Sequence, residues 1–322
     1  MRSGAVAWFR PMGLNLRVEA QNAELLRICT DMFGGFGPGD RKKPADLRVS
    51  AEAAVTADPV FQLPDYQLPA FHFYDGWAYV EAGNKQIIRA HPATGTVDAC
   101  FPQELLRDEA VLRRHYLQFA LAVLLEARGF TGVHAAGLER NGCTLLVRGA
   151  RGSGKSVLAC EAVGRGWRLL ADSTLWIGPE GNWWGIPWWL HLRPSALSLF
   201  PNLFFAPTAN TGGGSESKLE ISIIQIRSNG SITHAPAGTV LFLDQNFQSQ
   251  SRLETITAEE SLALWAAGAT GREGMGPNYG KRVAQALAKG GYRLRIGSNL
   301  GQGVDLLDRL AECNSRLIQS VE

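Results

Sequence analysis

The sequence predicts a mixed α/β fold, with a larger domain at residues 106–322 behind a smaller α+β extension at residues 1–105. In the larger part, residues 144–163 run from an apolar strand through a glycine-rich loop into a segment of helical character, which is the order of elements in α/β folds. In the smaller part, runs rich in Val, Ile, Phe and Tyr are separated by the turn pairs Asp75-Gly76 and Gly83-Asn84, as in a β-meander. A chain of 322 residues, 45% of them hydrophobic, can bury a full core.

Composition and charge argue against several broad classes of protein. Charged residues make up 19% of the chain and the formal net charge is +2, so neither intrinsic disorder nor a nucleic-acid or membrane partner bound through bulk charge is expected. No apolar run of about 18 residues occurs, and the apolar stretch at the start is too short for a signal peptide, so we expect a cytoplasmic protein. An odd number of scattered cysteines predicts reduced thiols and no zinc site: Cys29, Cys100, Cys143, Cys160 and Cys313.

The elements before the glycine-rich loop can be placed by their periodicity. Alternation at residues 14–18 predicts a strand, and the helical spacing of apolar residues at 25–33 predicts an amphipathic helix. A longer helix is expected over residues 107–128. Two short strands should follow at 132–138 and 144–147, and they should be antiparallel because the Asn-Gly pair between them tolerates positive φ.

A phosphate-binding motif follows the second of these strands. The pattern G-x-x-x-x-G-K-[ST] is filled by Gly149, Ala150, Arg151, Gly152, Ser153, Gly154, Lys155 and Ser156. In such a loop successive backbone N–H groups point inward, and the N-terminus of the next helix adds partial positive charge. Lys155 is expected to contact the β- and γ-phosphates of ATP, and Ser156 to ligate Mg²⁺. The flanking strand and helix argue against a chance glycine-rich loop.

Two carboxylates are candidates for the acidic partner of this loop. Asp172 follows the apolar run at residues 169–171, one predicted helix beyond Lys155. Asp244 ends the apolar run at residues 240–243 and has the character of a Walker B aspartate, which would hold the metal. A carboxylate near the γ-phosphate can instead accept the proton of an attacking hydroxyl. A Walker B aspartate that holds the metal is typical of an ATPase. A carboxylate that accepts the hydroxyl proton is typical of a transfer enzyme.

The segment from residue 134 to about residue 177 resembles the HPr serine kinase/phosphorylase superfamily. The resemblance rests on His134 in the hairpin, the loop at 149–156, the turn at 165–168 and the strand ending in Asp172. It implies a P-loop kinase core like that of phosphoenolpyruvate carboxykinase, with a β-hairpin leading into the loop. It also implies that Asp172 is the general base and a Mg²⁺ ligand, and that His134 is catalytic together with Lys155. From the residues alone, a core or capping role for His134 is favoured.

The chain also departs from the pattern of the bifunctional enzymes. Val157 stands where they carry an acidic residue after the loop serine, and Ser173 replaces the second aspartate of their Asp-Asp pair. The chain therefore resembles the divergent, kinase-only relatives, which implies transfer of the γ-phosphoryl of ATP to a serine of a peptide or small protein. Two alternatives remain, a small-molecule kinase and a weakly catalytic nucleotide-binding regulatory module. We also expect a homo-oligomer.

Further residues are candidates for contacts with the substrate. Arg193 suits phosphate recognition through its planar donor fork, and a surface salt bridge fits it equally. Lys218 follows a flexible-looking segment at residues 208–217 that would either close over the substrate or stay disordered. Aromatic side chains could form a platform for a peptide or adenine, or simply a core hairpin: Trp167, Trp176, Trp183, Trp184, Trp188 and Trp189.

Overall fold

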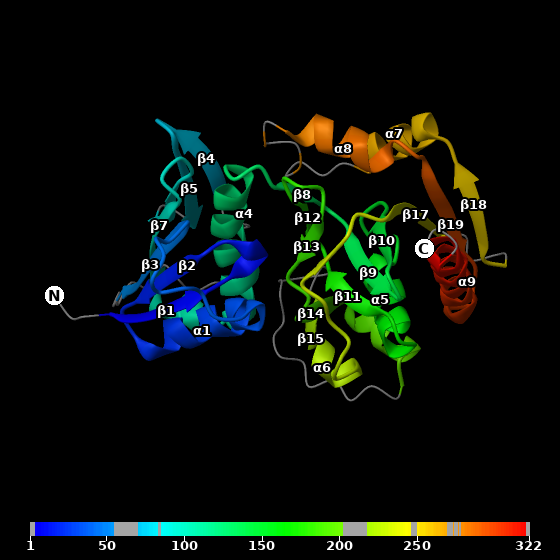
Figure 1. Ribbon diagram of the computed structural model, residues 1–322. Coiled ribbons are helices and arrows are strands. Elements are labelled where there is room, and N and C mark those ends of the chain that lie inside the picture. Colours follow the sequence, from blue (N-terminus) through cyan, green and yellow to red (C-terminus); the bar gives the residue numbers. More distant parts are fainter. Residues whose placement is uncertain are drawn as a thin grey trace. The chain divides into compact units, whose positions relative to one another are not determined.

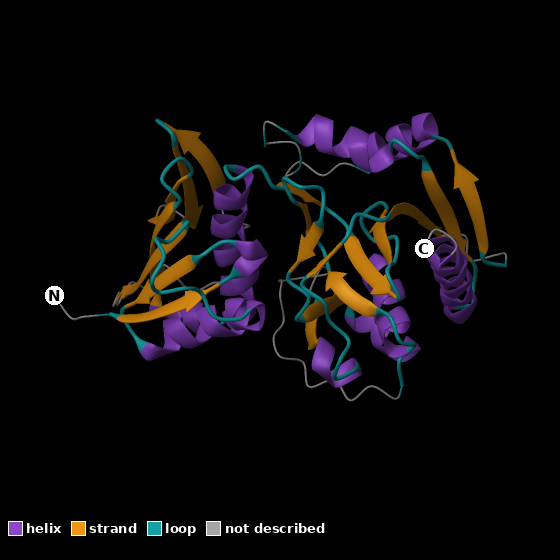
Figure 2. Ribbon diagram, viewed as in Figure 1, coloured by secondary structure: helices purple, strands orange, loops and turns teal. Residues whose placement is uncertain are grey.

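The computed structural model describes residues 4–54, 70–82, 85–201, 218–245, 250–268, 273, 276 and 278–319. The chain forms two compact units, the first comprising Met1–Arg128 with Pro207–Glu220 and the second Gly129–Ala206 with Ile221–Glu322. Both contain helices and strands, so the α/β class is confirmed (Figures 1 and 2). The units divide after Arg128, and the predicted domain boundary between residues 105 and 106 stays a prediction. Among the described residues, no helix is both long and apolar enough to cross a membrane.

The first unit is built on a seven-stranded sheet with the order β1-β2-β3-β7-β6-β5-β4. Its strands are β1 (Ala5–Phe9), β2 (Leu16–Ala20), β3 (Leu47–Ala54), β4 (Ala70–Tyr74), β5 (Trp77–Ala82), β6 (Lys85–His91) and β7 (Thr96–Pro102). Its helical segments are η1 (Pro11–Gly13), α1 (Ala23–Phe33), η2 (Gly34–Phe36), α2 (Gln103–Leu106), α3 (Glu109–Val111), the π-helical η4 (Leu112–Leu117) and α4 (Gln118–Glu126).

The sheet of this unit is only partly the predicted meander. Strands β4 to β7 are antiparallel neighbours, as a meander requires, but β3 pairs in parallel with both β2 and β7. The parallel pairing of β2 with β3 follows from the helix α1, which connects these two strands and returns the chain in the same direction. Asn22 caps this helix by accepting a hydrogen bond from the Leu25 N–H at 2.8 Å. Its apolar face, including Leu25 and Ile28, is buried.

The second unit contains a six-stranded sheet of order β11-β9-β10-β17-β19-β18, a four-stranded sheet β16-β13-β12-β8 and a two-stranded pair β14-β15. The strands are β8 (Thr131–Val133), β9 (Ala136–Arg140), β10 (Cys143–Arg148), β11 (Arg168–Ala171), β12 (Leu175–Ile177), β13 (Trp183–Gly185), β14 (Trp189–Leu192), β15 (Leu219–Ser222), β16 (His234–Ala235), β17 (Thr239–Gln245), β18 (Arg252–Ile256) and β19 (Gly291–Ile296). The helices are α5 (Lys155–Gly164), η5 (Pro194–Leu199), α6 (Ile223–Ile226), α7 (Ala258–Ala267), α8 (Tyr279–Leu287) and α9 (Leu300–Gln319).

The central strand β10 of the six-stranded sheet is buried on both faces. Leu145 and Val147 of β10 pack in a cluster with residues of α5 and α9, whereas Leu146, on the opposite face of the strand, packs in a cluster with residues of β12, β13, α7 and α8. All six residues of β10 are buried, which explains its continuous apolar run. The central strand that leads into the glycine-rich loop is therefore held from both sides.

The strand directions gather several loops at one edge of this sheet. Strand β9 is antiparallel to both β10 and β11, and β10 is parallel to β17. The ends of β10, β11 and β17 therefore lie at the same edge as the start of β9, where α/β proteins commonly bind ligands. The predicted single strand over residues 132–138 is wrong, because it breaks into β8 and β9, which join different sheets. His134 lies in this break.

Candidate active site

The glycine-rich loop lies between β10 and α5 and has a backbone that only glycine adopts without strain. Gly152 and Gly154 have φ angles of 85° and 89°, in the left-handed region. A Cβ atom on Gly149 would lie 2.6 Å from the Leu243 carbonyl oxygen and 2.7 Å from Ser153 Oγ. Helix α5 begins immediately after the loop, so its N-terminal N–H groups and partial positive charge face the loop. This geometry suits an anionic group such as phosphate.

Lys155, the first residue of α5, is folded back over the loop. Its Nζ donates to the carbonyl oxygens of Gly149 at 2.8 Å and Ala150 at 3.1 Å, and the residue is 8% exposed. The ammonium group is thus held beside the loop backbone, with its long stem buried. A phosphate bound in the loop would lie within reach of this cation.

Asp172, which follows β11, is brought to the start of α5. Its Oδ1 accepts a hydrogen bond from the Ser156 hydroxyl at 2.8 Å. Its Oδ2 accepts from the backbone N–H of His191 at 2.8 Å and lies 3.2 Å from His191 Nδ1. The carboxylate side chain is only 1% exposed. The structure therefore joins two of the predicted site residues, Ser156 and Asp172, and adds a third, His191.

Asp244 occupies a different environment. It lies near the end of β17, and its Oδ2 accepts from the Arg293 guanidinium at 2.6 Å. Both side chains are partly exposed, at 46% and 32%. Whereas Asp172 is bonded to the loop serine, Asp244 is paired with a cation of the neighbouring strand β19.

His134 is held by a hydrogen bond of its ring. Its Nδ1 lies 2.8 Å from the carbonyl oxygen of Ser173, which can only accept, so Nδ1 carries the proton and Nε2 is left as an acceptor. Burial and the positive charge of Lys155 lower the pKa of His134, and Ser173, Glu273 and Asp172 only partly oppose this. His134 is accordingly neutral at pH 7. Ser173, which carries this carbonyl, has a φ of 75°.

A buried ion pair not foreseen from the sequence lies next to His134. Arg148, the last residue of β10, is fully buried, and its guanidinium binds both carboxylate oxygens of Glu273 at 2.9 and 2.7 Å. Glu273 also accepts from the backbone N–H of His134 and from the Tyr279 hydroxyl. The guanidinium lies 4.0 Å from the centre of the Trp265 ring. Glu273, which lies between α7 and α8 in the chain, is thereby tied to the strand that carries the loop.

The remaining predicted residues differ in where the structure places them. Arg193 follows β14, and its Nη2 would lie 3.7 Å from a Cβ atom on Gly152, so its guanidinium is next to the loop. Lys218 belongs to the first unit, and its predicted contact stays a prediction. Residues 208–217 lie outside the described part of the chain. The predicted hairpin is formed by β12 and β13, and three tryptophans of the cluster are core residues: Trp167, Trp176 and Trp183.

The oxygen atoms near the loop match the preferences of Mg²⁺. The Ser156 hydroxyl and the Asp172 carboxylate are hard oxygen donors, and Mg²⁺ is usually held by one or two such protein ligands together with phosphate oxygens and water. In the described part of the chain, no three His, Cys, Asp or Glu side chains form a group that could hold a metal ion. Ser156 and Asp172 are the residues that would hold Mg²⁺ here.

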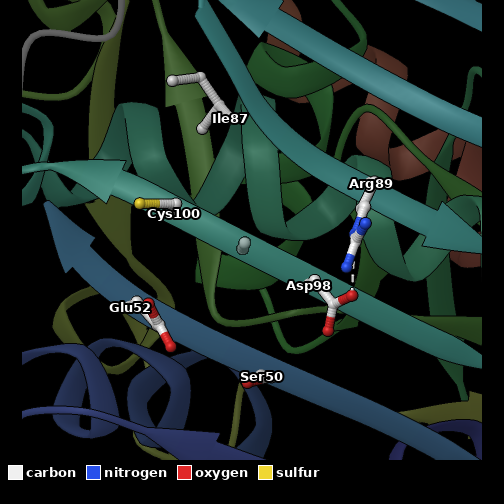
Figure 3. Close-up of a pocket in the computed structure, with 7 residues that line it drawn as sticks. Ser50, Glu52, Ile87, Arg89, Asp98 and Cys100 are labelled. Carbon is white, nitrogen blue, oxygen red and sulfur yellow. Dashed lines mark hydrogen bonds and ion pairs between the residues drawn. The ribbon is translucent and has the colours of Figure 1, made fainter.

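The first unit also has a hollow, of about 320 Å³, on the polar face of its sheet (Figure 3). Side chains from three adjacent strands line it, among them Ser50, Glu52, Arg89 and Asp98. The Arg89 Nε donates to Asp98 Oδ2 at 2.9 Å, and both side chains are about half exposed. Because this cation and this anion already pair with each other, the hollow does not resemble a site prepared for a charged ligand.

No protein-family model and no curated protein matches the chain. Among solved structures, the chain is similar to the HPr(Ser) kinase/phosphatase from Coxiella burnetii, with a TM-score of 0.31 and 13% sequence identity. The similarity covers 59% of this chain and 92% of that one. It is weak in both sequence and structure, so the chemistry of the site rests on the site's own geometry.

Proposed function

We propose that this protein is an ATP-dependent phosphotransferase of the HPr kinase-like type. It would move the γ-phosphoryl group of ATP to the hydroxyl group of a serine in a peptide or small protein. The observation that carries this proposal is the hydrogen bond between Ser156 and Asp172, which brings a carboxylate to the first turn of the helix behind the glycine-rich loop. A loop of this geometry binds phosphate, and a carboxylate beside it can serve as a base or as a metal ligand.

Each site residue has a distinct role in this proposal. The N–H groups of the loop and the ammonium group of Lys155 bind the phosphates, and the Arg193 guanidinium next to Gly152 adds a further cation. Ser156 and Asp172 would hold Mg²⁺, which when bound neutralises charge on the β- and γ-phosphates. His134, neutral and with Nε2 as an acceptor, can take a hydrogen bond from the acceptor hydroxyl or from water.

The chemical step is a transfer in which atoms and charges balance. The acceptor oxygen forms a bond to the γ-phosphorus, while the bond from that phosphorus to the bridging oxygen breaks and ADP leaves. The hydroxyl proton passes to the Asp172 carboxylate, which later releases it to water. Positioned proton transfer of this kind contributes roughly 10²–10⁴-fold to a rate.

A transfer assay tests the proposal. The protein is incubated with γ-labelled ATP, Mg²⁺ and candidate acceptors, which include peptides encoded near its gene and free serine, and products are examined for the mass of one added phosphoryl group. We expect label on a serine of a peptide or protein, and none with Lys155→Ala. Label on free serine alone would favour a small-molecule kinase. Nucleotide binding without transfer would indicate a regulatory module, and absence of nucleotide binding would contradict the whole proposal.

A further inference from the structure

His191 reaches the site from strand β14, whose other side chains explain its direction. Leu190 and Leu192 are fully buried in the cluster shared with α5 and α9. Successive side chains of a strand point to opposite faces, so His191 projects away from that cluster. On that side its imidazole contacts the carboxylate of Asp172, and its side chain is 10% exposed. Two residues further on, Arg193 lies beside Gly152.

Two groups of His191 contact the same oxygen atom. The backbone N–H lies 2.8 Å and the ring Nδ1 lies 3.2 Å from Asp172 Oδ2. A carboxylate can only accept hydrogen bonds, so the ring nitrogen that faces it carries a proton. The Ser156 hydroxyl donates to the other oxygen, Oδ1, at 2.8 Å. The carboxylate is thus held from opposite sides by residues of two different elements.

This arrangement determines how the carboxylate is oriented. Rotation about the terminal bond of an aspartate is broad and has no sharp preference of its own. The bonds to His191 fix Oδ2, and so they fix the direction in which Oδ1 meets Ser156 and the glycine-rich loop. Neighbours that orient a metal-binding or catalytic group typically change affinity or activity by roughly 10–100-fold when they are removed.

We propose that His191 is a positioning residue for Asp172, and that its ring holds the carboxylate in the orientation that phosphoryl transfer requires. This inference rests on the proposed function, and it adds a residue outside the glycine-rich loop motif. The role is one of hydrogen bonding by the ring. It needs no change in the protonation of the ring during the reaction.

Substitutions at position 191 separate the ring contact from the backbone contact. His191→Ala removes the ring and keeps the backbone N–H. His191→Asn also removes the ring, but it returns an N–H donor close to the place of Nδ1. The control is His234→Ala in β16. It removes a strand histidine whose ring stacks on that of Trp184, with 4.8 Å between the ring centres. Three quantities are measured: kcat and KM for ATP, the affinity for Mn²⁺ in the presence of a non-hydrolysable ATP analogue, and the melting temperature.

For His191→Ala we expect kcat and Mn²⁺ affinity to fall by roughly 10–100-fold, with an unchanged affinity for metal-free nucleotide. His191→Asn should recover most of both, and the control should match the wild type. Wild-type values of kcat and Mn²⁺ affinity for His191→Ala would overturn this inference and leave the proposed function standing. So would equal losses in His191→Ala and His191→Asn together with lower melting temperatures, because the ring would then serve only packing. If the wild-type protein binds no nucleotide, the proposed function fails and this inference fails with it.

Discussion

Asp172 follows β11 and Asp244 lies near the end of β17, two strands that end at one edge of the six-stranded sheet, but the partners of the two aspartates differ. Asp172 is buried and bonded to Ser156, whereas Asp244 is half exposed and paired with Arg293. Exposed ion pairs contribute little free energy, typically about 0–1 kcal/mol. The chemistry of the site should therefore depend on Asp172.

Asp172→Asn should lower turnover by roughly 10²–10⁴-fold while ATP still binds, because the amide keeps the shape of the side chain but cannot accept the hydroxyl proton. Asp244→Asn is the matched control and should change turnover much less. Steady-state kinetics with calorimetric measurement of ATP affinity checks both variants. The opposite ranking would indicate a conventional P-loop ATPase in which Asp244 holds the metal.

The residues of the site were predictable to the extent that they belong to local patterns. The loop motif specified Lys155 and Ser156, and the short distance along the chain to the next apolar run drew attention to Asp172. His191 and Glu273 give no such signal, because each acts through a partner that is remote in the sequence. Contacts between remote segments depend on how strands are ordered in the sheets, and one sequence does not reveal that order.

At the scale of elements, the loop and the β9–β10 hairpin turn provide a matched pair of glycines. Gly152 in the loop and Gly142 in the turn have φ angles of 85° and 81°, so alanine at either position pays a similar backbone cost of roughly 1–2 kcal/mol. A Cβ atom on Gly142 meets nothing within 4 Å, whereas one on Gly152 would point toward the Arg193 guanidinium.

We expect Gly152→Ala to weaken ATP binding by about tenfold or more, which is about 1.4 kcal/mol, because its methyl group stands between the loop and Arg193. Gly142→Ala should lose similar stability and keep its ATP affinity. Denaturant unfolding measures the first quantity and calorimetric titration the second. Equal ATP affinity in the two variants would place the phosphates away from this side of the loop.

The ion pair between β10 and the segment before α8 should be visible in the pH dependence of stability. Burial alone raises the pKa of Glu273, but the hydrogen bond and charge of Arg148, the His134 N–H and the Tyr279 hydroxyl outweigh burial, so the pKa lies below its ordinary value of 4.5. A carboxyl group with a lowered pKa stabilises the folded state above its unfolded pKa. This stabilisation is lost as the pH falls through the folded pKa.

Glu273→Gln should therefore lower the free energy of unfolding at pH 7 by about 3–5 kcal/mol, because it leaves the buried Arg148 without its anion. The difference from the wild type should shrink as the pH is lowered below 4.5. The control Glu254→Gln removes a half-exposed partner of Arg295 and should cost at most about 1 kcal/mol. A difference between Glu273→Gln and the wild type that stays constant with pH would contradict this assignment.

Several elements of the second unit could be predicted, and the exceptions have physical causes. Strands β10, β11 and β17 carry apolar runs that fix their type. The break at His134 was not foreseen, because the other residues from Gly132 to Leu138 are small or apolar and give no sign that the two halves of the segment pair with different sheets. In the first unit, the parallel pairing of β3 with β7 depends on a partner more than 40 residues away along the chain, which periodicity does not encode.

At the scale of the whole molecule, the seven-stranded sheet belongs to the first compact unit and the six-stranded sheet to the second, and the nucleotide site proposed here lies in the second unit. A ligand that binds only the folded form stabilises it by about 2.7 kcal/mol at a concentration 100 times its Kd. ATP with Mg²⁺ should therefore slow amide hydrogen exchange in β10 and α5, which flank the loop, and leave exchange in β2 and β3 of the first unit unchanged. Exchange followed by mass spectrometry checks this, with Lys155→Ala as the variant that should show no nucleotide effect. Equal protection in both units would mean that they fold as one cooperative body, whereas no protection in β10 or α5 would remove the nucleotide from this loop.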